Sequence, residues 1–193
     1  MKRLCLHFQT SLQYLTHPSL IPTFADEILI VLVKHAKQND LTLALAYYYS
    51  VLPALTQQAA IESLFSAVAR TSVTEAFYFC RIQSEHAQEH LFEMLIALAL
   101  ANQPNTSTAE RSLELVKLPM TKQEEAWFEN YLLRGEGRSI QTGKAALMMR
   151  MIGTGKVLEA SALKGPTSRA IGGLDWNSLI ATANKGLGSR AAS

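Results

Sequence analysis

The sequence predicts an all-α fold of short antiparallel helices in an irregular, solenoid-like arrangement, followed by a glycine-rich extension. Three observations lead to this prediction. Apolar residues recur at helical spacing through most of residues 1–134. Several Ser and Thr residues have a Glu three positions later, which is typical of helix starts. Finally, no strand-like segments joined by Asn-Gly or Asp-Gly occur in the 193 residues.

Glycine and charge divide the chain near Arg134. All ten glycines lie at Gly135 or beyond, and glycine is unfavourable inside helices. Residues 1–134 carry 10 Lys and Arg against 13 Asp and Glu, whereas residues 135–193 carry 8 against 3. We therefore predict a helical domain over residues 1–134 and a basic, partly ordered extension with short helical segments over residues 135–193.

The composition argues against several classes of protein. The net charge of +2 is too small to indicate nucleic-acid binding by itself, and the basic residues of the extension are spaced as in an ordinary linker. Two cysteines, Cys5 and Cys80, cannot build a disulfide framework, so we expect a reducing compartment. The longest uncharged stretch, residues 41–61, is interrupted by Pro53 and does not predict a membrane span.

Charge order and cap residues indicate the first helices. The apolar run over residues 28–33 follows two acidic residues and precedes basic ones, which is the order that a helix dipole favours. Asp40 is predicted to cap the next helix, which continues to Pro53. Thr56 is predicted to begin another, in which the following residues share one face: Ile61, Leu64, Phe65 and Val68.

The segment SVTEAFYFCR, residues 72–81, could be a reactive site or one helix of a scaffold. With Ser72 as the cap, Val73, Ala76, Phe77 and Cys80 fall at the spacing of a core stripe. We therefore predict that Cys80 is buried and acts as a small apolar residue. We expect Arg81 to lie along the edge beside Tyr78, with no catalytic role.

Further helix starts follow along the chain. Capping boxes are predicted at three pairs of positions, and Ser84 is predicted to cap the helix that follows it. The pairs are Ser72 with Glu75, Ser107 with Glu110, and Thr121 with Glu124.

The motif HAQEH offers the sharpest chemical alternative. His86 and His90 lie four residues apart on one helix face and could hold a zinc ion, with Glu89 between them as in the H-x-x-E-H pattern. The motif has no recognisable third ligand, so we interpret these side chains as a solvated face. The segment GTGK, residues 153–156, lacks the rest of a phosphate loop and is interpreted as a joint.

Two apolar islands in the extension are candidate partner-binding segments. Methionine side chains adapt to irregular partner surfaces, and an exposed tryptophan is a frequent anchor. The predicted partner-binding residues are Met148, Met149 and Met151 in residues 147–152, and Trp176 and Leu179 in residues 174–180. Folding of both segments back onto the helical body remains an open alternative.

Several segments occur in a recognisable order over roughly residues 10–134. Ser72-Val73 precedes Glu75-Ala76-Phe77, Arg81 follows the aromatic residues, and Leu118-Pro119 leads into Thr121, Glu124 and Glu125. In this the chain resembles the helical ELYS-like domain of fungal nucleoporins. The resemblance implies a solenoid-like helical domain with no enzymatic activity, which attaches to the Y-shaped scaffold complex of the nuclear pore. The residues themselves show no convergent cluster of acids, bases or nucleophiles, so we predict no catalytic residues, no metal site and no cofactor.

The functional prediction is therefore a non-catalytic structural nucleoporin at the nuclear pore that binds other nucleoporins and supports pore assembly. Two alternatives are a generic helical adaptor between proteins and a small zinc hydrolase that uses His86, Glu89 and His90.

Overall fold

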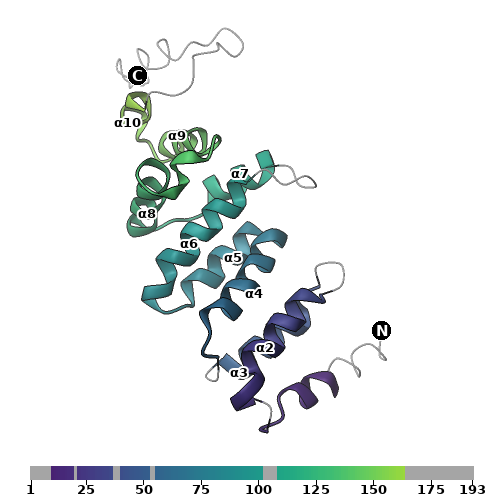
Figure 1. Ribbon diagram of the computed structural model, residues 1–193. Helices are drawn as coiled ribbons and strands as arrows, with labels where there is room; N and C mark the ends of the chain where they lie inside the picture. Colours follow the sequence, from purple (N-terminus) through teal and green to yellow (C-terminus); the bar gives the residue numbers. More distant parts are fainter. Residues whose placement is uncertain (1–9, 20, 37–39, 53–54, 102–107, 164–193) are drawn as a thin grey trace, which may run out of the picture. The chain divides into compact units, whose positions relative to one another are not determined.

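A computed structural model describes residues 10–19, 21–36, 40–52, 55–101 and 108–163. Every secondary-structure element in these residues is a helix, which confirms the predicted all-α class (Figure 1). The chain forms two compact units that divide between Ala99 and Leu100. Trp176 and Leu179, two predicted partner-binding residues, lie outside the described residues.

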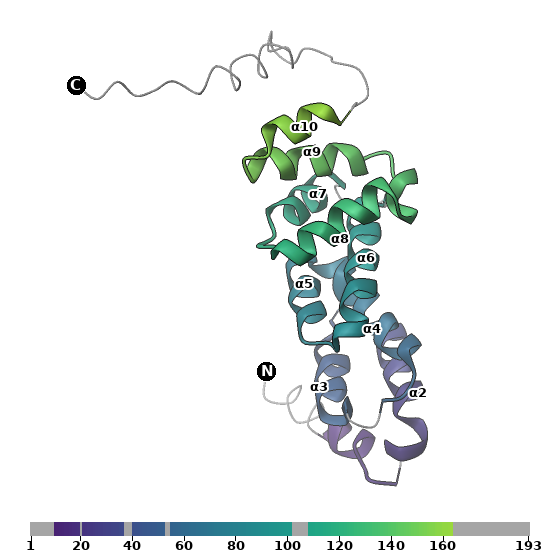
Figure 2. The same ribbon diagram turned by 90° about the vertical axis from the view of Figure 1, so that its left-hand side faces the viewer.

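The first unit is a set of packed helices. A short helix covers residues 10–15. α4 packs against both α2 and α5, and α2 also packs against α3 (Figure 2). The bounds are Ile21–Lys34 for α2, Thr42–Val51 for α3, Gln58–Thr71 for α4, Val73–Arg81 for α5 and Glu85–Leu100 for α6, most of which belongs to this unit.

Two aspartates accept hydrogen bonds from residues near the starts of α3 and α4. Asp40 accepts hydrogen bonds from the Thr42 amide at 3.1 Å and the Thr42 hydroxyl at 2.6 Å. These bonds lower the pKa of the Asp40 carboxyl. The start of α4 is stabilised differently, because Asp26 of α2 accepts from the Thr56 amide and hydroxyl and from the Gln57 amide. Asp26, on a distant helix, therefore holds the two residues that lead into α4.

Residues 72–81 form α5 and its N-cap, as expected for a helix of a scaffold. The Ser72 hydroxyl accepts a hydrogen bond from the Glu75 amide at 3.2 Å, as expected of an N-cap. All four members of the predicted core stripe are buried, and Phe79 is buried as well. The Phe77 ring lies 6.0 Å from that of Phe92 on α6, so this helix is part of the core.

The second unit includes residues 135–163. Its elements are α7 (Thr108–Lys117), α8 (Lys122–Leu133), the 3-10 helix η3 (Glu136–Ser139), α9 (Gly143–Gly153) and α10 (Val157–Ala162). α9 packs against α7, α8 and α10, and η3 packs against α8. Residues 136–162 therefore belong to a folded unit. The division of the chain at residue 134 into family domain and extension stays a prediction.

The start of α8 has the complete capping box expected there. The Thr121 hydroxyl accepts from the Glu124 amide at 3.3 Å, and the Glu124 carboxylate accepts from the Thr121 amide at 2.6 Å. The Ser107 member of the third predicted box lies outside the described residues.

A glycine is needed where η3 crosses α8. A Cβ atom on Gly137 would come within 2.5 Å of the Tyr131 ring and 3.0 Å of its backbone oxygen. The absence of a side chain at Gly137 therefore allows close packing on the Tyr131 ring.

Candidate interaction surface

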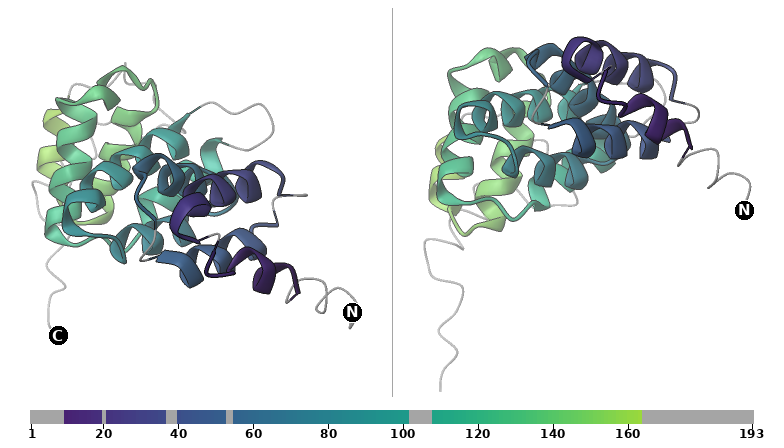
Figure 3. Two further views of the ribbon diagram at one scale, coloured as in Figure 1. Left: turned by 60° about the horizontal axis from the view of Figure 1, so that its bottom comes forward. Right: turned by 90° about the horizontal axis from the view of Figure 1, so that it is seen from below.

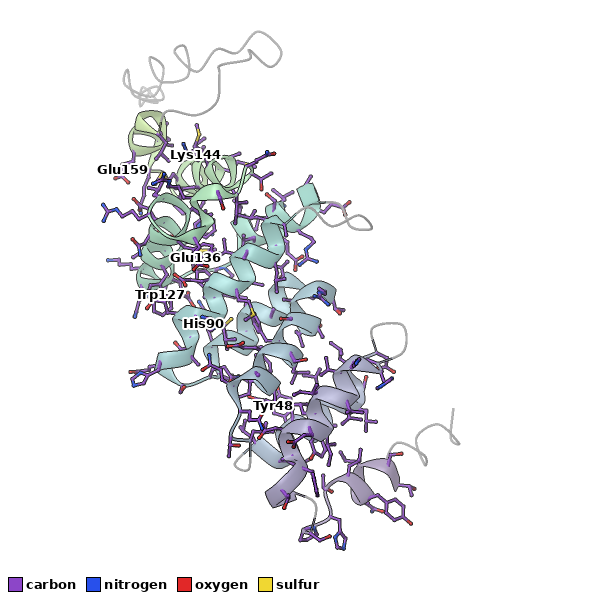
Figure 4. The ribbon with its side chains drawn as sticks, in the orientation of Figure 1. Tyr48, His90, Trp127, Glu136, Lys144 and Glu159 are labelled. Carbon is purple, nitrogen blue, oxygen red and sulfur yellow. The ribbon has the colours of Figure 1, made fainter. Side chains whose placement is uncertain are left out.

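The HAQEH residues lie at the start of α6. His90 Nε2 lies 3.0 Å from Glu62 Oε1 of α4, so this histidine has a carboxylate partner (Figure 4). His86 and Glu89 are exposed. Among the described residues, no group of three or more His, Cys, Asp and Glu side chains is placed to hold a metal ion. The contact with Glu62 links α6 to α4.

The positions of Cys80 and Arg81 fit a structural role for both side chains. The Cys80 side chain is 3% exposed, as predicted from the stripe. The Arg81 guanidinium carbon lies 4.3 Å from the Phe77 ring centroid and 6.0 Å from that of Tyr78. This placement confirms the predicted position beside Tyr78, where the cation contacts aromatic rings.

The three methionines of α9 do not share one environment. Met149 is 44% exposed, Met148 is half-buried and Met151 is 5% exposed. Successive helix residues are rotated by about 100°, so a dense run of methionines is spread around the helix. Met149 and Ile152, which is 39% exposed, share the outer side of α9. Met151 instead packs in the core, so a docking surface on α9 does not include it.

Arg150 makes polar contacts with two other helices of the second unit. This role was not predicted from the sequence. Its Nη1 donates to the backbone oxygens of Val116 at 2.7 Å and Leu118 at 2.6 Å, where α7 ends. Its Nη2 lies 3.0 Å from Glu125 Oε1 on α8. The sequence signal was a single cation inside the apolar run LMMRMI. Arg150 thus connects α9 to both α7 and α8.

The segment GTGK forms the turn between α9 and α10. Gly155 has a φ of 81°, a backbone conformation that favours glycine. Lys156 Nζ lies 3.5 Å from Glu125 Oε2. The lysine therefore joins the ion pair of Arg150 and Glu125, and the segment acts as a joint between helices.

An apolar hollow on the first unit was also not predicted. We call it the aromatic groove. Its walls include three well exposed side chains, Tyr49 of α3 at 58%, Tyr78 of α5 at 51% and Ile82 at 60%. The hollow has a volume of about 350 Å³ and is lined by Leu45, Tyr49, Val68, Glu75, Tyr78, Phe79 and Ile82. The available signal was the run of three tyrosines, residues 47–49, of which a helix can bury only some.

The other two tyrosines of that run are buried. Tyr48 donates to Gln83 Oε1 at 3.0 Å, and its ring centroid lies 5.3 Å from that of Phe79. Burial raises the pKa of both Tyr47 and Tyr48; for Tyr47 the Asp26 carboxylate adds to the effect, and for Tyr48 the bond to Gln83 opposes it. Both hydroxyls therefore remain protonated at neutral pH.

A protein-family model matches residues 5–135 of the chain. The matching family is ELYS, described as acting in nuclear pore complex assembly. The chain belongs to the ELYS family. This confirms the family expected from the order of segments along the sequence; the fungal origin stays a prediction. Searches of curated proteins and of solved structures found no match.

ELYS-family membership indicates the general function. The family consists of structural nucleoporins, so it indicates a role in nuclear pore complex assembly, contact with other nucleoporins and a place at the nuclear pore or in the nucleus. In the part of the chain that the structure describes, no helix has the length and apolar character needed to cross a membrane.

Proposed function

We propose that this chain is a non-catalytic structural nucleoporin that docks onto the Y-shaped scaffold complex and supports nuclear pore assembly. The observation that carries the proposal is the ELYS family match, which extends over residues 5–135. The side chains that looked reactive in the sequence support it as well. Cys80 is buried in the core, and His90 contacts Glu62.

We propose that docking uses apolar side chains beyond residue 135. Met149 and Ile152 are exposed on α9, and the half-buried Met148 lies one turn before Ile152 on the same helix. Flexible methionine side chains fit irregular partner surfaces. Trp176 and Leu179 complete the proposed set as an aromatic and an aliphatic anchor further along the chain.

Localisation and affinity purification test the docking proposal. A fluorescently tagged chain should give a punctate nuclear rim, and purification from the native cell should enrich subunits of the Y-shaped complex in stoichiometric amounts. A diffuse signal without those subunits would instead favour a general helical adaptor.

Substitutions test the proposed anchors. Met149→Asp and Trp176→Ala should each reduce recovery of the scaffold subunits by about tenfold, since one anchor contributes roughly 1–2 kcal/mol. Lys122→Ala, at an exposed residue on α8, is the matched control. Recovery equal to the control for both variants would refute the anchors, while the family role would stand.

A further inference from the structure

The aromatic groove has the features of a surface to which another segment or molecule binds. Tyr49, Tyr78 and Ile82 expose half or more of their area around one hollow, and Phe79 and Val68 form its buried floor. Tyrosine-rich hollows of this kind are typical of contact sites, because an aromatic ring buries a large area at small entropic cost. Isolated apolar side chains need no explanation, but a cluster around a hollow does.

The lining of the groove carries a single negative charge. Glu75 is its only charged lining residue, and α3 carries no charged side chain at all. The Glu75 carboxylate makes no ion pair within the described part of the chain. A complementary occupant would therefore combine apolar side chains with a nearby cation.

We propose that residues 1–9 of this chain, MKRLCLHFQ, bind in the aromatic groove. Leu4, Leu6 and Phe8 alternate with other residues, so an extended segment would turn all three to one side. Lys2 and Arg3 precede them and supply the cations that would pair with Glu75. The segment thus matches both the apolar character and the charge of the groove.

The segment is also attached in a suitable place. It continues directly into the helix of residues 10–15, which belongs to the same unit as the groove. Figure 2 and Figure 3 both draw that helix next to α3, whose Leu45 and Tyr49 line the groove. Nine extended residues reach at most about 30 Å, whereas the ten residues of α3 span only about 15 Å. The chain length is therefore sufficient to cross the groove.

Disulfide trapping tests this contact in the full chain. With Leu4, Leu6 and Phe8 facing the groove, Cys5 faces away from it, so Cys5→Ser and Leu6→Cys together move the thiol of the segment to position 6. In that chain Ile82→Cys places a second thiol at the groove edge, and the native Cys80 is buried. Gln58→Cys places a thiol at an exposed site of the same unit that does not line the groove, as the matched control. Under mild oxidation at low protein concentration, we expect the thiol at position 6 to form a disulfide with the thiol at position 82 at least about tenfold faster than with the thiol at position 58, because binding raises the effective thiol concentration.

Charge reversal supplies a second readout. Glu75→Lys should slow formation of the disulfide between the thiols at positions 6 and 82, and the additional changes Lys2→Glu and Arg3→Glu should restore its rate. Glu85→Lys, at an exposed position on α6, is the control and should leave the rate unchanged.

Three outcomes would overturn the proposal. Equal rates at positions 82 and 58 would leave the groove to another occupant, such as a helix of a partner protein. A disulfide that forms only between two molecules would show a second copy of the chain in the groove. A Glu75→Lys variant that forms the bond at the unchanged rate would remove the charge match on which the assignment rests.

Discussion

Arg150 on α9 and Glu125 on α8 form an ion pair with 3.0 Å between Nη2 and Oε1. The Arg150 side chain is 13% exposed and that of Glu125 is 22% exposed, so water screens this pair only in part. Because Nη1 also donates to two backbone oxygens where α7 ends, one guanidinium holds three helices together. The stability of the second unit should depend strongly on this residue.

Arg150→Ala should lower the free energy of unfolding by about 2–3 kcal/mol. The change leaves Glu125 without its main partner and two backbone oxygens without their donor, and each such loss costs roughly 1 kcal/mol or more. Urea denaturation measures the effect. Lys144→Ala on the exposed side of the same helix is the control and should change stability by less than about 0.5 kcal/mol. Equal effects of the two substitutions would contradict the role of Arg150.

Cutting the chain after Gly135 should destabilise α7 and α8, whereas a cut after Leu163 should not. The shorter chain loses α9, which packs against both helices, and it exposes apolar side chains such as Phe128 and Leu132. Hydrogen exchange in α8 compares the two truncated chains with the full one. Equal protection in the 1–135 and 1–163 chains would show that α9 is dispensable.

Local patterns in the sequence were sufficient to predict most of the helices. The stripe of residues 73–80 and the cap at Thr121 depend on residues within one or two turns, and the structure confirms both. The buried state of Cys80 followed from the same stripe. Periodicity and capping are short-range effects, which a single sequence records directly.

Contacts between distant segments could not be predicted in this way. Asp26 accepts a hydrogen bond from Thr56, 30 residues later and just before α4, and nothing in the sequence pairs the two. The hollow between Tyr49 and Tyr78 likewise depends on how α3 and α5 lie beside each other. Met151 was grouped with Met149 because they are close in sequence, although helical rotation buries one and exposes the other.

Asp26→Ala should lower the free energy of unfolding by about 2–3 kcal/mol. Asp26 is 6% exposed and its carboxylate accepts three hydrogen bonds from Thr56 and Gln57, so its loss leaves these donors without their acceptor just before α4. Thermal unfolding measures the change. The exposed neighbour Glu27→Ala is the control and should change stability only slightly. A similar melting temperature for both variants would show that water replaces the Asp26 carboxylate as the acceptor.

Tyr47→Phe should reduce the loss of stability at alkaline pH. Burial, with a further contribution from Asp26, raises the pKa of Tyr47 in the folded state above its unfolded value near 10. The folded state then holds the proton more tightly. The stabilisation that comes with the protonated Tyr47 hydroxyl is therefore complete below about pH 10 and is lost as pH rises through the folded pKa. The hydroxyl has no hydrogen-bond partner among the described residues, so the change should be nearly neutral at pH 7.

Urea titrations at pH 7 and pH 11 measure the effect of Tyr47→Phe. The stability of the wild type should fall more steeply between these values than that of the variant. Tyr14→Phe, at a side chain that is 73% exposed, is the control and should follow the wild type. Parallel profiles for all three proteins would assign alkaline unfolding to other groups.

Cys80 should resist alkylation in the folded protein. A thiol reacts as its thiolate and needs access to water, but the Cys80 side chain is 3% exposed within the core stripe of α5. Iodoacetamide should therefore modify Cys80 only as fast as α5 opens, and quickly once guanidinium unfolds the chain. The matched control is Ile82→Cys, a site two residues further along that is 60% exposed in the wild type. Peptide mapping distinguishes the two thiols. Native labelling of Cys80 as fast as that of the control would mean that this thiol is accessible and activated, which a scaffold helix does not require.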